Sequence, residues 1–80
     1  MGHAVARDYT INEVIREFIN ENDKSPMKIA DKAGIRRDTF SRILKCKRPI
    51  YADELIPILN AAGIPLDTVT DAVQAARRSA

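Results

Sequence analysis

The sequence predicts an all-α domain of five short helices. Three observations favour this fold class: apolar residues recur at helical spacing, glycine and proline stand where helices should begin or end, and no segment alternates apolar and polar residues as a strand does. The chain has 80 residues, 45% of them hydrophobic, which suffices for one core. With one cysteine and one histidine, Cys46 and His3, we expect helix packing alone to stabilise it, without a disulfide or a metal.

The first predicted helix has the clearest pattern, because five apolar residues fall at i, i+3, i+4, i+7 and i+8: Ile11, Val14, Ile15, Phe18 and Ile19. Thr10 and Glu13 have the spacing of a capping box, and Tyr9 is placed to pack on Val14. Residues 20–24 are too polar to continue the stripe. We expect residues 1–8 to form a flexible arm and residues 9–80 to form the domain.

The second and third helices have distinct local signals. Ser25 is a preferred N-cap, Pro26 suits a first helical position, and Gly34 suits the left-handed residue that ends a helix. The third helix is predicted over about Arg37 to Lys45, with an apolar face of Phe40, Ile43 and Leu44. Pro49 prevents it from continuing.

The fourth helix is predicted over about Asp53 to Ala62, ending at Gly63, with Leu55, Ile56, Leu59 and Ala62 facing inward. Pro57 must lie in its first turn or kink it. The fifth is predicted over about Leu66 to Arg78, and its apolar side comprises Leu66, Val69, Val73 and Ala76. That side could belong to the core or to a dimer interface, and the pattern does not separate the two.

Charge is strongly segregated along the chain. Residues 24–48 hold nine of the thirteen Lys and Arg residues but two of the eleven Asp and Glu residues, a net charge of +7, while the remainder carries −5. Such a division favours a bound polyanion on one face. The composition offers nothing from which to build an enzyme site or a cofactor site: there is no cysteine–histidine pair and no glycine-rich phosphate loop. Cys46 is interpreted as an incidental thiol.

No apolar run approaches the roughly 18 residues that a membrane span requires. The first ten residues have no apolar core of a signal peptide, and a lone thiol fits a reducing compartment. The sequence therefore predicts a soluble, cytoplasmic protein.

The order of residues between the second and third helices is that of a helix-turn-helix. Ala30 is small where two helices approach, Gly34 allows a sharp turn, and Ile35 and Phe40 can hold the following helix on the core. Its other face would then be free to enter a DNA major groove.

The stretch SPMKIADKAGIRRDTFSRILKCKR, continued through ELIPILNAAGIPLDTV, resembles the phage lambda repressor/Cro-like (Xre-type) helix-turn-helix family. The resemblance covers about Ile11 to Val69, and the matching positions are Ala30, Gly34, Ile35, Ile43 and the run from Ala62 to Asp67. It implies a five-helix bundle that binds palindromic operators, commonly as a homodimer.

The resemblance also implies site residues. Base-edge contacts are expected from Arg37, Asp38 and Arg42, and phosphate contacts from Ser25, Arg36, Ser41, Lys45, Lys47 and Arg48. The chain departs from the family at Pro26, where glutamine is usual, and at Cys46, where glycine is common. Proline can neither contact a phosphate nor brace a neighbouring side chain as glutamine does.

Each expectation has a plainer alternative. Arg37 and Arg42 could be ordinary solvated charges, and Asp38 could simply stabilise a first helical turn. The solvent-exposed face of a helix would equally account for Lys24, Lys28 and Lys32. Two functions stay open: a sequence-specific transcriptional regulator bound to double-stranded DNA, or an interaction module that also binds a protein partner, as an antitoxin or the N-terminal part of a larger regulator does.

Overall fold

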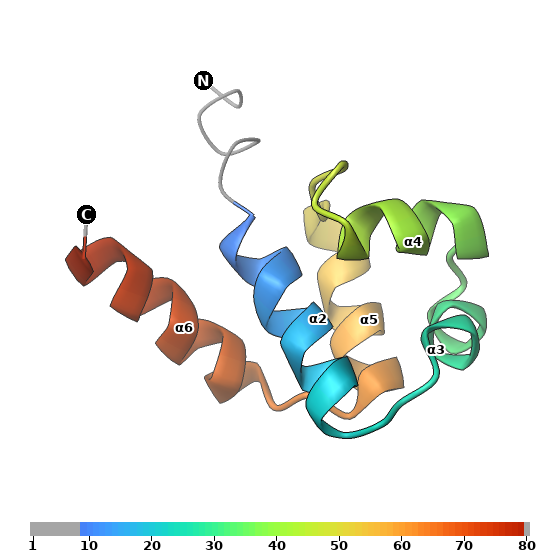
Figure 1. The fold of residues 1–80 in the computed structure, drawn as a ribbon, viewed down its shortest axis with the longest axis horizontal. Helices are drawn as coiled ribbons and strands as arrows, with labels where there is room; N and C mark the ends of the chain where they lie inside the picture. The colour runs from blue at the N-terminus through green and yellow to red at the C-terminus, as the bar shows by residue number, and fades with distance from the viewer. Residues whose placement is uncertain (1–8, 80) are drawn as a thin grey trace.

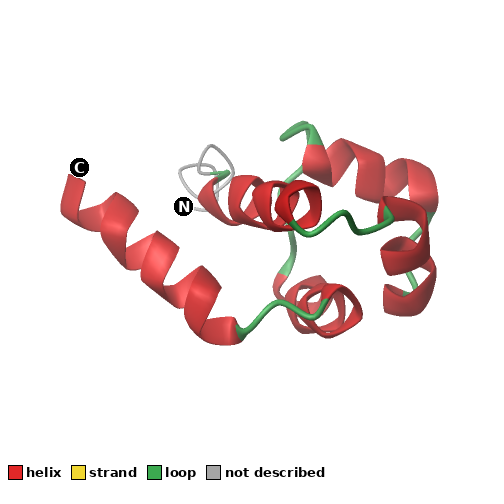
Figure 2. Ribbon diagram, turned by 60° about the horizontal axis from the view of Figure 1, so that its bottom comes forward, coloured by secondary structure: helices red, strands yellow, loops and turns green. Residues whose placement is uncertain are grey.

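The computed structural model describes residues 9–79, with side chains through residue 76, and it is all-helical. The predicted N-terminal arm, residues 1–8, lies outside the described residues. The helices are α2 (Thr10–Glu21), α3 (Pro26–Ala33), α4 (Arg37–Leu44), α5 (Ala52–Ala62) and α6 (Leu66–Ser79). Figure 2 shows them joined by short loops, with no strand within residues 9–79.

The core lies where α2, α3, α4 and α5 converge. Its largest fully buried side chains come from α2, α4 and α5: Ile15, Phe40, Ile43 and Ile58. Helix α3 packs on α5 and α4, whereas α2 packs on α4 and α6. Helix α6 contacts this core through Val69, and its C-terminal part extends away from α3 and α4 (Figure 1). The two helices of the predicted helix-turn-helix therefore lie on the opposite side of the molecule from the end of α6.

The local signals of α3 act as predicted. Ser25 is the N-cap and its Oγ accepts a hydrogen bond from the Lys28 N–H at 3.4 Å, while Pro26 is the first helical residue. Gly34 ends the helix with φ 74°, in the left-handed region. The N–H of Ile35 then donates to the carbonyl oxygen of Ala30 at 2.9 Å, which closes the turn toward α4.

The predicted capping box at the start of α2 is wrong. The N–H of Glu13 donates to the carbonyl oxygen of Tyr9 at 2.9 Å, so Tyr9 is the N-cap and Thr10 is already helical. A capping box requires its Ser or Thr at the N-cap itself. The reciprocal carboxylate contact occurs instead at α5, where Glu54 Oε1 accepts from the Tyr51 N–H at 3.1 Å.

The buried side of α5 differs from the predicted one at a single residue. Leu59 and Ala62 are buried and Leu55 is half-buried, as predicted. Ile58 is buried, whereas Ile56, predicted to face inward, is 49% exposed. Consecutive helical residues are about 100° apart, so residues two apart lie on nearly opposite sides. Pro57 lies beyond the first turn, inside the helix.

The apolar side of α6, which the sequence left open between the core and a dimer interface, is only partly covered by the core. Leu66 is 54% exposed and Ala76 is exposed, while Val69 is buried and Val73 half-buried. Only the middle of the helix therefore packs on the core. Within the described residues, every helix is too short or too polar to cross a lipid bilayer.

Candidate nucleic-acid interface

Helix α4 presents one polar face outward. Its inward face is anchored by Phe40 and Ile43, which are 1% and 0% exposed. Arg37, Asp38, Arg42 and Lys45 are exposed, and Ser41 is half-buried. The three predicted base-contacting residues therefore share an accessible surface on one short helix.

The C-terminal end of α4 is held from α2. The last carbonyl oxygens of a helix lack partners within the helix and must find them elsewhere. The side-chain amide of Asn12 donates to the carbonyl oxygen of Ile43 at 2.9 Å, and Arg16 Nη1 donates to that of Leu44 at 3.4 Å. Sequence reasoning missed Asn12, although this polar residue precedes Ile15 by three positions and Ile19 by seven, on the buried side of the stripe.

Arg37 is tied back to α3. Its guanidinium forms two hydrogen bonds with the carboxylate of Asp31, Nε to Oδ1 at 3.2 Å and Nη2 to Oδ2 at 2.8 Å. The hydrogen bond from Arg37 holds the pKa of Asp31 below its ordinary value, and the same bond raises the pKa of Arg37. Asp31 is the second residue that sequence reasoning missed; the available signal was an acid six positions before a candidate arginine.

Arg36 and Asp38 form a second pair on the same end of α4. Arg36 Nε lies 3.3 Å from Asp38 Oδ1, and their side chains are 83% and 55% exposed. An exposed pair with a single contact, unlike the two-point pair of Arg37 with Asp31, contributes little to stability, so both side chains can exchange partners at small cost.

Arg48, a predicted phosphate contact, is largely engaged within the protein. Its Nη1 and Nη2 donate to the two carboxylate oxygens of Glu54, each at 2.9 Å, and Nη1 also donates to the carbonyl oxygen of Pro49 at 3.2 Å. Its guanidinium carbon lies 4.6 Å from the centre of the Tyr51 ring. The hydrogen bond from Arg48 lowers the pKa of Glu54 and the bond from Glu54 raises that of Arg48. Arg48 thereby joins the loop after α4 to the start of α5.

A shallow cavity of about 280 Å³ lies between the first turn of α3 and the outer face of α4. Its lining comprises Pro26, Met27, Arg37, Phe40, Ser41, Leu44 and Lys45. Arg37, Ser41 and Lys45 recur every four residues and so form one stripe of α4. Pro26, the departure from the family pattern, therefore borders this same surface.

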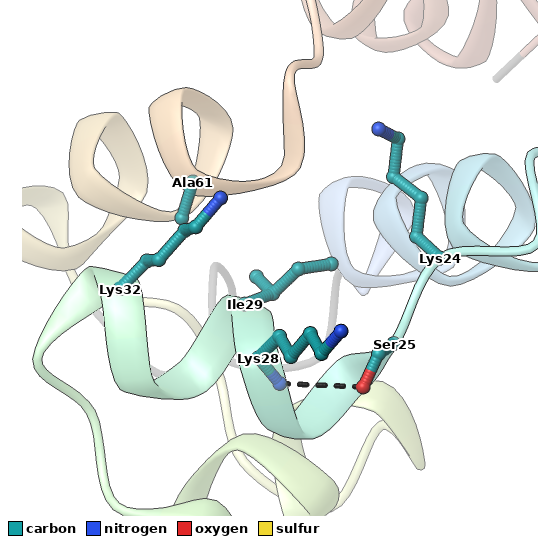
Figure 3. Close-up of a pocket in the computed structure, with 6 residues that line it drawn as sticks. All are labelled: Lys24, Ser25, Lys28, Ile29, Lys32 and Ala61. Atoms are coloured by element: carbon teal, nitrogen blue, oxygen red, sulfur yellow. Dashed lines mark hydrogen bonds between the residues drawn. The ribbon is translucent and has the colours of Figure 1, made fainter.

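A second cavity has a volume of about 150 Å³. Its lining comprises the three lysines Lys24, Lys28 and Lys32 together with Ser25, Ile29 and Ala61. Figure 3 shows Lys28 and Lys32 projecting from α3 and Lys24 from the segment before it. The ammonium group of Lys24 lies beside Gly63, the residue that ends α5: a Cβ built at Gly63 would be 3.7 Å from Lys24 Nζ. The cation is therefore close to the negative end of the α5 dipole. This position explains Lys24 without a ligand.

No protein-family model matches the chain, and neither does any curated protein or solved structure. Among the described residues, no three His, Cys, Asp or Glu side chains are grouped so as to hold a metal ion.

Proposed function

We propose that this protein is a sequence-specific double-stranded DNA-binding transcriptional regulator of the phage lambda repressor/Cro-like (Xre) type, with α3 and α4 as its helix-turn-helix. One observation carries the proposal: α4 is fixed to the core through Phe40 and Ile43 while its polar face is exposed in the most basic part of the chain. An α-helix with its side chains is about 10–12 Å in diameter, so α4 can enter a major groove about 12 Å wide.

In this proposal Arg37, Asp38 and Arg42 contact base edges. Arginine can donate two parallel hydrogen bonds to guanine, and aspartate can accept one from cytosine. Of the three, only Arg42 makes no ion pair within residues 9–76. Its guanidinium therefore reaches a base without breaking an existing interaction.

Ser25, Arg36, Ser41, Lys45, Lys47 and Arg48 are the proposed phosphate contacts. Ser25 Oγ accepts a hydrogen bond as an N-cap, yet its own O–H can still donate to a phosphate. Arg48 has three of its five N–H groups occupied by Glu54 and Pro49, which leaves Nε and one N–H of Nη2 for a phosphate. Both residues thus combine a structural contact with a free donor.

The proposed partner is a palindromic operator bound by a homodimer, with half-sites about one helical turn apart. The proposed place of action is the cytoplasm, and no cofactor is required. Fluorescence anisotropy with random duplex DNA at several salt concentrations is the first test. Binding that weakens steeply with salt supports the proposal, because each neutralised phosphate releases a counterion. A flat plot of log K against log salt contradicts it.

Two exposed apolar side chains support a second candidate, a module that also binds a protein partner. Ile56 on α5 and Leu66 at the start of α6 are 49% and 54% exposed. Light scattering on the purified chain, with and without Leu66→Asp, tests whether a homodimer covers this surface. A dimer that becomes monomeric in the variant favours the regulator; a parent chain that is already monomeric favours a separate partner.

A further inference from the structure

The Arg37 guanidinium is held along one edge. Arg37 is the first residue of α4, and Asp31 lies in the last turn of α3. The Asp31 carboxylate accepts from Nε and Nη2, the two nitrogens whose N–H groups point the same way. Arg37 Nη1 lies 3.8 Å from Met27 Sδ, also on α3, as a weak donor. The arginine is thus fixed by α3 at two points.

The donors of Arg37 can be counted. A guanidinium has five N–H groups, and three of them are engaged by Asp31 and Met27. Asp31 occupies the Nε–Nη2 edge, which leaves the Nη1–Nη2 edge for another acceptor, since the contact of Nη1 with sulfur is weak. The two N–H groups of that edge can pair with the O6 and N7 acceptors that guanine presents in the major groove. The pairing with Asp31 therefore leaves the arginine competent for two-point recognition.

We propose that Asp31 is a positioning residue for base readout: it holds Arg37 so that the Nη1–Nη2 edge meets guanine rather than a phosphate. This inference rests on the proposed function. An unrestrained arginine has many side-chain conformations and loses entropy when it is ordered on a base. A restrained arginine has already lost this entropy in the free protein, and its donors are directed at one position.

The carboxylate also has an opposing electrostatic effect. Asp31 carries a negative charge, about half exposed, within the basic stretch that we propose faces phosphates. Its charge should weaken binding to any DNA sequence. Asp31 is thus expected to lower affinity for random duplex while raising preference for guanine, a combination that a purely structural residue does not produce.

The test compares two duplexes. The first is selected from a random library, and the second is the same duplex with 7-deazaguanine, which lacks N7, in place of the guanine whose recognition is lost in Arg37→Ala. We expect Asp31→Asn to reduce the preference for guanine over 7-deazaguanine about fivefold or more, within the range that one bidentate contact is worth. Affinity for random duplex should rise, because the variant removes a negative charge from the basic surface. Asp71→Asn, which removes an exposed carboxylate on α6, is the matched control and should leave the preference unchanged.

A double-mutant cycle separates positioning from a general charge effect. In an Arg37→Ala background, Asp31→Asn should have no further effect on the guanine preference. The Arg37 Nε–H signal in the NMR spectrum of the free protein should shift in Asp31→Asn, which tests the contact without DNA.

The inference is overturned if Asp31→Asn retains the full guanine preference, or if it lowers the preference equally with and without Arg37. Either result would leave the proposed function standing, since the parent would still bind its site selectively. Absence of any salt-dependent duplex binding by the parent would overturn both.

Discussion

Asn12 on α2 donates its side-chain amide to the carbonyl oxygens of Ile43 and Arg48, at 2.9 Å each. One side chain thereby joins α2 to both the last turn of α4 and the loop that follows. Asn12 is the buried polar residue of the described chain, 2% exposed, and both acceptors lie more than thirty positions away. The orientation of the candidate DNA-reading helix depends on this contact, because it fixes the end of α4 remote from Arg37.

Replacing Asn12 should therefore destabilise the whole domain. Asn12→Leu removes both donors. The Ile43 carbonyl oxygen still accepts from the Cys46 N–H at 3.1 Å, whereas the Arg48 carbonyl oxygen loses its side-chain partner, at about 1–3 kcal/mol for a buried group. We expect a loss of about 1–3 kcal/mol in the free energy of unfolding, measured by urea denaturation. Asn20→Ala, an exposed position on the same helix, is the control and should change stability by less than about 0.5 kcal/mol. Equal effects of the two variants would contradict this role.

The Arg48–Glu54 pair should make stability depend on pH in the acid range. Hydrogen bonding to Arg48 lowers the folded-state pKa of Glu54 below its ordinary 4.5. A carboxyl group with a depressed folded-state pKa contributes stability that is present above its unfolded-state pKa and lost as the pH falls through the folded-state value. We expect Glu54→Gln to cost about 1–2 kcal/mol at pH 7 and less at pH 3. Urea denaturation of the parent and the variant at both pH values provides the measurement, and an equal cost at pH 7 and pH 3 would contradict this role of the pair.

Cys46 has a backbone conformation that disfavours any residue with a side chain. Its φ of 58° is in the left-handed region, which is less favourable by roughly 1–2 kcal/mol for a residue with a Cβ than for glycine. Cys46→Gly should raise the free energy of unfolding by about 0.5–1 kcal/mol, after the greater entropy of the unfolded glycine chain is subtracted. Cys46→Ser retains the Cβ and should be nearly neutral. A Cys46→Gly variant less stable than the parent would show that the thiol makes a stabilising contact.

The buried side of α5 predicts a contrast between two isoleucines that are two residues apart. Ile58 is fully buried and Ile56 is half exposed. Ile58→Ala should cost about 2–5 kcal/mol because it leaves a cavity in the core. Ile56→Ala should cost less than about 1 kcal/mol. Thermal and urea unfolding of both variants would measure the difference, and the reverse order would place the buried side of α5 elsewhere.

Variants of Arg42 and Lys47 should affect DNA binding differently, because Arg42 is the proposed base contact and Lys47 the proposed phosphate contact. Arg42→Ala should cost about 1–3 kcal/mol on the selected site and relax its sequence preference, because a base contact is lost. Lys47→Ala should weaken specific and random duplex alike and reduce the salt slope by about 1. Binding isotherms on both duplexes at several salt concentrations provide the measurement. Equal losses on both duplexes for Arg42→Ala would mean that it contacts a phosphate.

The helices themselves were predictable where their signals are local. Ser25, Pro26 and Gly34 delimit α3 as expected, because capping and left-handed termination act through the backbone of a single turn. Phe40 and Ile43 are buried and Arg42 is exposed, since helical spacing alone separates the two sides of α4. The all-helical class followed from the same periodicity.

Tertiary packing decided which polar groups pair. The buried side of α5, by contrast, follows from spacing, since residues 55, 58, 59 and 62 fall at i, i+3, i+4 and i+7, so the inward assignment of Ile56 misread the period. Asn12, Asp31 and Glu54 acquire partners on other elements, at distances set by how those elements dock. Periodicity reports the hydrophobicity of one helix at a time, whereas a hydrogen bond between helices depends on the angle and register of both.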